Sequence, residues 1–355
     1  MNLRSVEKAL LFLFLFGGLA TAQDRNPTSS SVAPDIVKLF ATVRDKHGKI
    51  VSNLTKDDFV LTQDDHPQII QTFSKDTDLP LTVGLVFDTG TNQAGALDRE
   101  RSASHDFLDQ VLRESKDKAF IIHFDREVEL LQDLTSSRDK LFNALGLLQT
   151  ARSGRDNEGD SGEQGQRRTS HGHPNVLYDA IYLACNELMK TQHDRKVLIV
   201  MSNGVDRNSR ETVGSAIESA QRTDTLVYTA LSKDEEPASA GRGFGFPGGG
   251  GMGRRGGAPR RAPEETPTDA KKILEQISRE AGGGFFEISK KQPMSQIYGA
   301  IQEELRHQYQ ISYTPTQSGD WSGFHKIQLT TRQKDWVVET RQGFYAGTDN
   351  RTSPP

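Results

Sequence analysis

The sequence predicts an α/β protein in which a mostly parallel sheet is covered by helices on both faces. Short, unbroken apolar runs at residues 81–87, 119–124, 197–201 and 226–231 alternate with amphipathic segments of helical period. Strands that are apolar on both faces are typical of buried parallel sheets, and their alternation with helices predicts βαβ units. Both flanks of this region show a period of two instead, which predicts a small antiparallel β unit.

Three short strands are predicted in the N-terminal flank, residues 35–79. Residues 37–43, 59–62 and 69–73 are rich in β-branched and aromatic side chains, and turns containing Gly or Pro separate them. The flank therefore predicts an antiparallel unit that precedes the parallel sheet.

The central region, residues 80–308, supplies the helices that cover the predicted sheet. In each helix apolar residues recur every three or four positions, as Leu177, Ile181 and Cys185 do, so one stripe faces the sheet. The expected helices span residues 96–112, 140–148, 175–189, 212–222, 270–281 and 294–307.

Alternation returns in the C-terminal flank, residues 309–346, which a short tail, 347–355, follows. The predicted strands are residues 309–313, 326–330 and 336–340. We expect these strands to pair with those of the N-terminal flank, so that the two flanks form one β unit beside the α/β region.

Two polar segments, residues 152–172 and 232–268, interrupt the central region. Neither carries enough apolar surface to offset the entropy of ordering, so both are predicted to be mobile inserts. The second is rich in Gly, Arg and Pro, and its Arg/Gly runs resemble segments that bind single-stranded nucleic acids. Polyanion binding there stays an alternative to a solvated linker.

Composition excludes several classes of protein. The chain has 355 residues, a formal net charge of −4 and one cysteine. The near balance of charge argues against a strongly basic nucleic-acid protein, so no nucleic-acid partner is expected. One cysteine excludes a disulfide scaffold and a cysteine-rich zinc module, and Cys185 is expected to be buried on the apolar stripe of its helix.

The N-terminus predicts export. Arg4 and Lys8 precede the apolar run 9–19, and Ala20-Thr21-Ala22 supplies the small residues that signal peptidase accepts. Residues 1–22 are therefore a predicted signal peptide, cleaved near Ala22. No later segment is long and apolar enough to span a bilayer, so the mature chain is expected to be extracytoplasmic, either periplasmic or secreted.

Polar residues follow the apolar strands at the points where ligands bind in α/β sheets. Such ligands lie beyond the carboxyl ends of the strands. The candidate residues form a predicted partner-binding rim at this edge of the sheet. They are Asp88, Thr89, Thr91, Asn92, Asn175, Asn203 and Asp206.

The strand ends resemble those of a von Willebrand factor type A domain, a Rossmann-like α/β fold. The segments are LVFDTGTN at 85–92, NVLYDAI at 175–181 and VLIVMSNGVDRNS at 197–209. The flanks are more narrowly similar to the VWFA-related Acidobacterial domain group, through DKHGKIVSNLTKDDF at 45–59, LTSSRD at 134–139 and GFYA at 343–346. The resemblance covers residues 35–346 and implies a non-enzymatic adhesion or complex-assembly module.

The resemblance also implies a metal-ion-dependent adhesion site, here in degenerate form. The pattern Asp-x-Ser-x-Ser becomes Asp88, Gly90 and Asn92, the later Thr becomes Asn175, and the last Asp becomes Asn203. The candidate ligands are Asp88, Asn92, Asn175 and Asn203, with one carboxylate among them. We expect Mg²⁺ or another divalent cation to bind weakly there, or a hydrogen-bonded polar cluster to replace it.

Three other aspartates, at positions 125, 179 and 206, lie near the ends of predicted strands or at the start of a predicted helix. Asp206 offers a second carboxylate, although in the family that position faces away from the ion. Asp125 is expected to cap a turn, and Asp179 lies in the first turn of a helix, where the helix dipole favours a negative charge.

An enzymatic interpretation has weaker support. Residues 87–91 match the hydrophobic-Asp-Thr-Gly-Thr sequence of aspartic proteases, whose chemistry needs two carboxylates that share a proton. The one other Asp-Ser/Thr-Gly sequence, at Asp160, lies in the polar insert 152–172. His171 also lies in this insert and His173 directly follows it, and the two histidines lack zinc-site spacing. No catalytic residue is predicted. The expected function is an exported module that binds an unidentified protein partner, with a hydrolase that uses Asp88 as the alternative.

Overall fold

The computed structural model describes residues 36–75, 78–90, 94–149, 175–193, 195–232, 267–316 and 322–346. The predicted signal peptide, the polar insert 152–172, residues 233–266 of the second insert and the tail lie outside these residues, as do Thr91, Asn92, Asp160, His171 and His173. Among the helices that the structure describes, none is long and apolar enough to cross a membrane.

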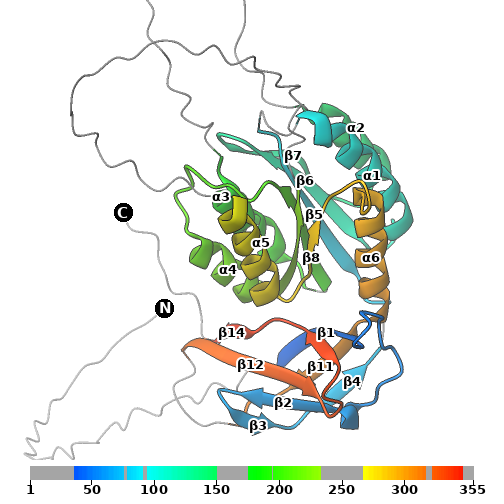
Figure 1. Ribbon diagram of the computed structural model, residues 1–355, viewed down its shortest axis with the longest axis vertical. Helices are drawn as coiled ribbons and strands as arrows, with labels where there is room; N and C mark the ends of the chain where they lie inside the picture. The colour runs from blue at the N-terminus through cyan, green and yellow to red at the C-terminus, as the bar shows by residue number, and fades with distance from the viewer. Residues whose placement is uncertain are drawn as a thin grey trace, which may run out of the picture. The chain divides into compact units, whose positions relative to one another are not determined.

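A six-stranded sheet forms the centre of the α/β layer, in the order β10-β9-β8-β5-β6-β7 (Figure 1). Its strands pair in parallel except for β7, which runs antiparallel to β6. Every residue of β5, β8 and β9 is buried, which confirms the predicted parallel sheet covered on both faces. The strands are β5 (Leu81–Asp88), β6 (Lys118–Phe124), β7 (Val128–Thr135), β8 (Arg195–Ser202), β9 (Thr225–Leu231) and β10 (Phe285–Glu287).

The strand β7 is not predicted from the sequence. Its apolar and polar residues do not alternate, since Leu130 and Leu131 are neighbours and the register to β6 shifts twice. As an edge strand it is half-exposed along its length, so neither face carries the clear signal of a buried strand.

Two helical layers cover the sheet (Figure 1). On one side α1 (Ala94–Val111), α2 (Arg138–Leu147) and α6 (Met294–His307) bury their apolar stripes. On the other side lie α3 (Leu177–Leu183), α4 (Val213–Arg222) and α5 (Pro267–Ala281). The helix predicted over residues 175–189 begins two residues later, and after Leu183 it continues as a π-helical segment, Ala184–Leu188, and a 3-10 turn, Met189–Thr191.

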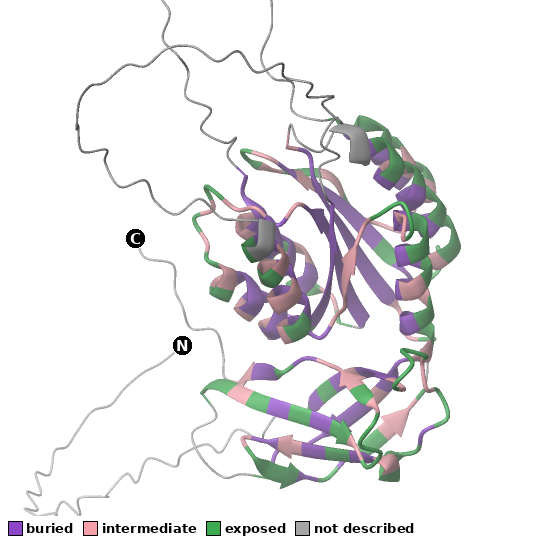
Figure 2. Ribbon diagram, in the orientation of Figure 1, coloured by how far each residue is buried: buried purple, intermediate pink, exposed green. Residues whose placement is uncertain are grey.

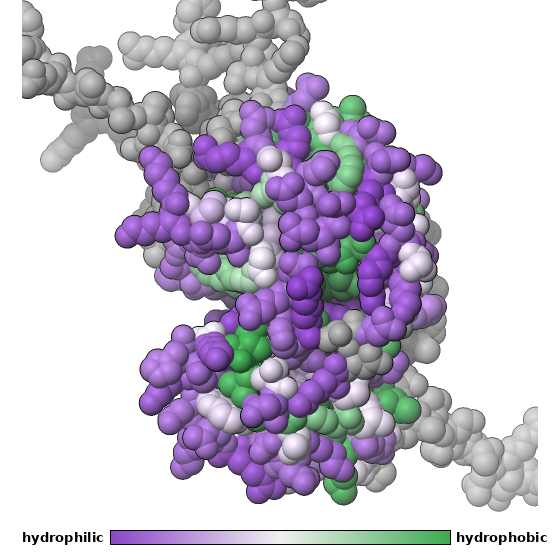
Figure 3. Space-filling model, turned by 90° about the vertical axis from the view of Figure 1, so that its right-hand side faces the viewer, coloured by the Kyte–Doolittle hydropathy of each residue, from purple (hydrophilic) through white to green (hydrophobic). Residues whose placement is uncertain are grey.

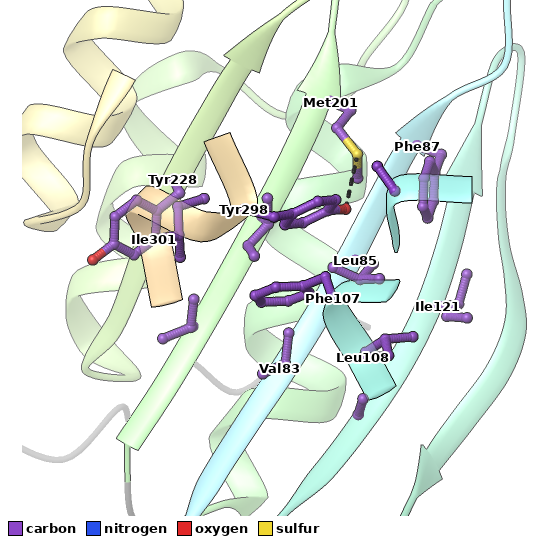
Figure 4. Packing of buried hydrophobic residues seen from close by; sticks show 14 of the residues in the cluster. Val83, Leu85, Phe87, Phe107, Leu108, Ile121, Met201, Tyr228, Tyr298 and Ile301 are labelled. Carbon is purple, nitrogen blue, oxygen red and sulfur yellow. Dashed lines mark hydrogen bonds between the residues drawn. The ribbon is translucent and has the colours of Figure 1, made fainter. Parts of the chain in front are cut away.

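The first of these cores contains close aromatic packing (Figure 4). The rings of Phe107 on α1 and Tyr298 on α6 stack with centroids 4.3 Å apart, over Val83 and Leu85 of the sheet. The Tyr298 hydroxyl approaches Met201 Sδ at 3.4 Å. Helices from the two ends of the α/β region are thereby fixed on the same sheet.

The face that α1, α2 and α6 present to solvent is mostly hydrophilic (Figure 3).

The N- and C-terminal flanks pair with each other in two four-stranded antiparallel sheets, β13-β1-β11-β4 and β14-β12-β2-β3. Their inward-facing residues form one core, and β12 alternates between exposed and buried positions (Figure 2). The strands are β1 (Val37–Arg44), β2 (Phe59–Gln63), β3 (His66–Gln68), β4 (Thr72–Ser74), β11 (Tyr309–Tyr313), β12 (Gly323–Thr331), β13 (Val337–Glu339) and β14 (Gly343–Ala346). A short 3-10 helix, Lys56–Asp58, precedes β2.

The single strand predicted at residues 69–73 is wrong. Gln68 ends β3 in one sheet and Thr72 begins β4 in the other, so the chain crosses between the sheets here. Ile69 is 74% exposed, whereas Ile70 is buried, with 7% exposed. Of these two adjacent apolar side chains, therefore, only one faces the interior.

Close packing at Gly84 gives the first prediction. A Cβ at this position in β5 would lie 2.3 Å from Phe120 Cζ and 2.6 Å from Leu198 Cδ1. Gly84→Ala is therefore expected to lower the free energy of unfolding by about 1–3 kcal/mol in urea denaturation. Gly146→Ala on α2 is the matched control, because nothing lies within 4 Å of its Cβ. There the free energy of unfolding should rise by up to about 1 kcal/mol, and equal effects at both positions would contradict the packing.

Candidate functional site

Asp88 is the last residue of β5, and its carboxylate is buried, with the residue 1% exposed. Gly90 N donates to Oδ1 at 3.1 Å. Three groups donate to Oδ2: Asn175 Nδ2 at 3.0 Å, Ser202 Oγ at 2.9 Å and Asn203 N at 3.4 Å. These donors come from three loops at the carboxyl edge of the sheet, so one side chain joins them.

Burial raises the pKa of Asp88 above its usual range. The four hydrogen bonds lower the pKa of the same carboxyl, but they do not outweigh the loss of hydration. The site therefore disfavours a free negative charge on its single mapped carboxylate.

Asn175 connects Asp88 to the loop after β8. Its backbone oxygen accepts from Arg207 N at 3.0 Å and Asn208 N at 3.3 Å. The side-chain amide nitrogen points to Asp88, and Oδ1 is buried without a hydrogen-bond partner within the described residues. Asn175 therefore connects the end of β5 to the loop after β8, and it lies at the edge of the sheet where the sequence pattern predicts it.

Asn203 and Asp206 shape the next loop. Asn203 Oδ1 accepts from Val205 N at 2.9 Å, which closes a local turn. Asp206 Oδ2 accepts from Tyr178 N at 3.1 Å, at the start of α3, and from Ser209 Oγ at 2.5 Å. The Asp206 carboxylate therefore binds backbone and hydroxyl groups of its own chain.

The other predicted residues take structural positions. Asp179 accepts from Arg210 N at 3.1 Å and Glu211 N at 2.8 Å, and Asp125 accepts from the turn residue Glu127 at 3.4 Å. Thr89 is 1% exposed, and its hydroxyl lies 3.0 Å from His123 Nδ1. Its side chain thus points into the protein and does not reach the surface of the rim. Cys185 is buried as expected.

Besides Ser202, two further buried residues of the site escape the sequence analysis. Glu100 on α1 and Ser232 after β9 are each 2% exposed, and Glu100 Oε1 has no hydrogen-bond partner within the described residues. Burial raises the pKa of Glu100 to about 7, the charge of Asp88 adds to the rise, and the Ser232 hydroxyl opposes it. The spacing of the sequence does indicate that Glu100 is buried, because Glu100 lies on the same buried face of α1 as Leu97 and Ser104.

The residues do not fit the divalent-metal site that the resemblance implies. Mg²⁺ requires oxygen ligands, whereas Asn175 presents its nitrogen to Asp88 and Gly90 has no side chain. A Cβ at Gly90 would lie 3.1 Å from Asp88 Oδ1, so a serine would have to share that space. Within the part of the chain that the structure describes, no three side chains of His, Cys, Asp or Glu cluster.

Glu100 gives a pH-dependent prediction. Its folded pKa of about 7 exceeds the ordinary 4.5, so the folded state binds this proton more tightly than the unfolded state. The contribution of Glu100 to stability is therefore greatest at low pH and falls as the pH rises from about 4.5 through about 7. Glu100→Gln should leave the free energy of unfolding nearly unchanged at pH 5 and raise it by about 2–3 kcal/mol at pH 8.

Urea denaturation at the two pH values checks this expectation. Glu303→Gln on α6 is the control, because Glu303 is exposed. An equal gain from both variants, or a gain from Glu100→Gln that does not depend on pH, would contradict the buried-acid interpretation.

No protein-family model matches the sequence, and neither does any curated protein. The chain is similar to the structure of a von Willebrand factor type A protein from Catenulispora acidiphila at 10% identity and TM-score 0.44, covering 90% of this chain and 76% of that one. It is similar to the vWF domain of a type V pili tip protein from Porphyromonas gingivalis at 11% identity and TM-score 0.42, covering 63% and 94%.

A third similar structure is proximal thread matrix protein 1 from the mussel byssus with a zinc-occupied MIDAS motif, at 13% identity and TM-score 0.42. The match covers 68% of this chain and 49% of that one. The narrower VWFA-related Acidobacterial group stays a prediction. In this chain, the parallel sheet between two helical layers confirms the predicted α/β fold class.

Proposed function

We propose that this protein is an exported, non-enzymatic module that binds a protein partner at the carboxyl edge of its sheet without a metal ion. The observation that carries the proposal is the hydrogen bond from Asn175 Nδ2 to Asp88 Oδ2 at 3.0 Å. An amide nitrogen occupies the side of the carboxylate where a cation would need an oxygen ligand. The rim is therefore held together by hydrogen bonds, and its contact with a partner does not depend on an ion.

The surface around Asp88 indicates which partner chemistry suits this rim. Asp88 itself is buried, and the neighbouring loops expose Arg126, Arg207 and Arg210. Arg207 and Arg210 belong to the loop that Asn175 and Asp179 hold through backbone hydrogen bonds. In metal-competent relatives the ion accepts an acidic residue of the partner. Here guanidinium groups take that role, since they bind carboxylates in bidentate geometry.

The hydrolase alternative uses Asp88 as a catalytic acid or base and needs a second carboxylate. Glu100 supplies one whose pKa the charge of Asp88 raises, but the two residues are only 1% and 2% exposed. A peptide substrate would have to reach both groups, which the burial of the pair opposes. The Arg/Gly insert of the polyanion alternative lies outside the described residues.

Metal independence can be tested by restoring the family pattern. The native chain should show no binding of Mn²⁺ by calorimetry at metal concentrations up to about 1 mM, because one buried carboxylate and amide groups bind hard cations weakly. The variant Gly90→Ser, Asn92→Ser, Asn175→Thr, Asn203→Asp adds a carboxylate and three hydroxyls and should gain Mn²⁺ affinity at least about tenfold. Tight Mn²⁺ binding by the native chain would contradict the proposal.

The arginine surface can be tested by charge reversal. The double variant Arg207→Glu, Arg210→Glu should lose at least about tenfold in affinity for a partner identified by crosslinking in the extracytoplasmic fraction, and chelator should not change the native affinity. Arg306→Glu at the end of α6 is the matched control, since Arg306 is exposed and far along the chain from the rim. Equal losses from both variants would place the contact elsewhere.

A further inference from the structure

A buried carboxylate lies where α6 passes into the flanking β unit. Glu304 follows Ile301 by three residues on the buried stripe of α6, and its side chain is only 3% exposed. No loop separates the two parts of the chain at this point, because α6 ends at His307 and β11 begins at Tyr309. Glu304 therefore lies at a direct connection between the α/β layer and the β unit.

Strands of both flanks supply groups that meet Glu304. Arg44, the last residue of β1, forms an ion pair with Glu304 and a second one with Glu339 of β13, where Arg44 Nε lies 3.2 Å from Glu339 Oε2. The strand β1 reaches α6 because it continues for three residues past Ala41, which pairs with Tyr309 at the start of β11. Glu304, Arg44 and Glu339 form what we call the Glu304 contact, which joins the end of α6 to β1 and β13.

Polar groups of the α/β layer reach the same place. The Tyr228 hydroxyl on β9 forms a hydrogen bond with the Glu304 carboxyl. Arg195, the first residue of β8, is buried and donates from Nη2 to the Leu305 carbonyl. The helix α1 packs on α6 through uncharged groups such as the Phe107 ring. The titratable groups near Glu304 in the described elements are Arg44 and Glu339 from the flanks, Tyr228 and Arg195 from the sheet, and Glu303, Arg306 and His307 on α6 itself.

These surroundings oppose a negative charge on Glu304. Burial raises the pKa of Glu304 to about 7, and the charge of Glu339 adds to the rise, while Arg44 and the Tyr228 hydroxyl lower it. If the contact opens and water reaches the carboxyl, the pKa returns toward the ordinary 4.5. The closed contact thus binds this proton more tightly than the open one, so it is most stable below about pH 4.5 and weakens as the pH rises through about 7.

A second contact holds the other end of β1. Arg341, between β13 and β14, donates from Nη2 to the Lys38 carbonyl at 2.8 Å and from Nη1 to the Gln221 carbonyl at 3.3 Å. It also forms an ion pair with Asp224, which is exposed, so this Arg341 contact does not depend on a buried carboxylate. Lys38 and Arg44 are the second and last residues of β1, about 20 Å apart along the strand. The two ends of β1 are therefore attached to the α/β layer by two different contacts.

We propose that Glu304 controls a pH-dependent hinge between α6 and the flanking β unit. While Glu304 is protonated, its carbonyl oxygen still accepts the hydrogen bond from Arg44, and β1 and β13 stay against α6. When Glu304 releases its proton to water, the carboxylate gains hydration by leaving the contact, and this end of the β unit moves away from α6. The Arg341 contact keeps the other end attached. The inference does not rest on the proposed function of the rim.

The test compares amide hydrogen exchange of the full chain at pH 5 and pH 8. Protection factors, which correct for the intrinsic pH dependence of exchange, should be at least about tenfold lower at pH 8 where β1 pairs with β13, at residues 42–44 and 337–339. Glu304→Gln should keep the protection of these amides at pH 8. Glu303→Gln is the matched control one residue away, because Glu303 is exposed, and it should show the same fall as the native chain.

Two further variants decide the test even if Glu304→Gln fails to fold. Glu339→Gln removes a charge that raises the pKa of Glu304, so the fall in protection should be smaller and should end at a lower pH. Glu100→Gln should leave the fall at the β1–β13 amides unchanged, since Glu100 lies near Asp88 and acts through global unfolding. Equal protection at both pH values, an unchanged fall in Glu304→Gln or Glu339→Gln, or a fall that Glu100→Gln abolishes would each overturn the proposal.

Discussion

The structure of the carboxyl edge of the sheet depends on the hydrogen bonds that the buried carboxylate of Asp88 accepts. This carboxylate lies at the end of a central strand whose residues are all buried, and it accepts hydrogen bonds from groups at residues 90, 175, 202 and 203. A buried carboxylate without such partners would cost several kcal/mol, by the usual order of magnitude. The loops after β5 and β8 and the segment before α3 are therefore positioned by the need to satisfy one side chain.

The same constraint explains how amide side chains keep this edge of the sheet in shape. Asn175 donates a hydrogen bond to Asp88 from its side chain, and Asn203 donates one to the same carboxylate from its backbone N–H while its side chain closes a turn. Amides can both donate and accept, so they can hold a carboxylate in the absence of a cation. The consequence is a buried acid that hydrogen bonds hold in place, while Arg126, Arg207 and Arg210 are exposed on the surrounding loops.

Much of this fold follows from periodicity, because buried parallel strands and amphipathic helices carry strong patterns. The strands at residues 81–87 and 197–201 and the positions of Asp88, Asn175 and Asn203 at one edge could be predicted for that reason. The edge strand β7 and the crossing at Ile69 could not, since partial exposure removes the alternation. Glu100 and Ser202 join the site only through tertiary contacts, and a polar residue on an apolar stripe was the one local sign of the former.

Anomalous diffraction from crystals grown with excess Mn²⁺ tests the central claim most directly. We expect no anomalous peak beside Asp88, and we expect the Asn175 amide nitrogen to remain within hydrogen-bond distance of the carboxylate. A peak at about 2.0–2.6 Å from Asp88, with the Asn175 amide turned so that its oxygen binds the ion, would contradict it.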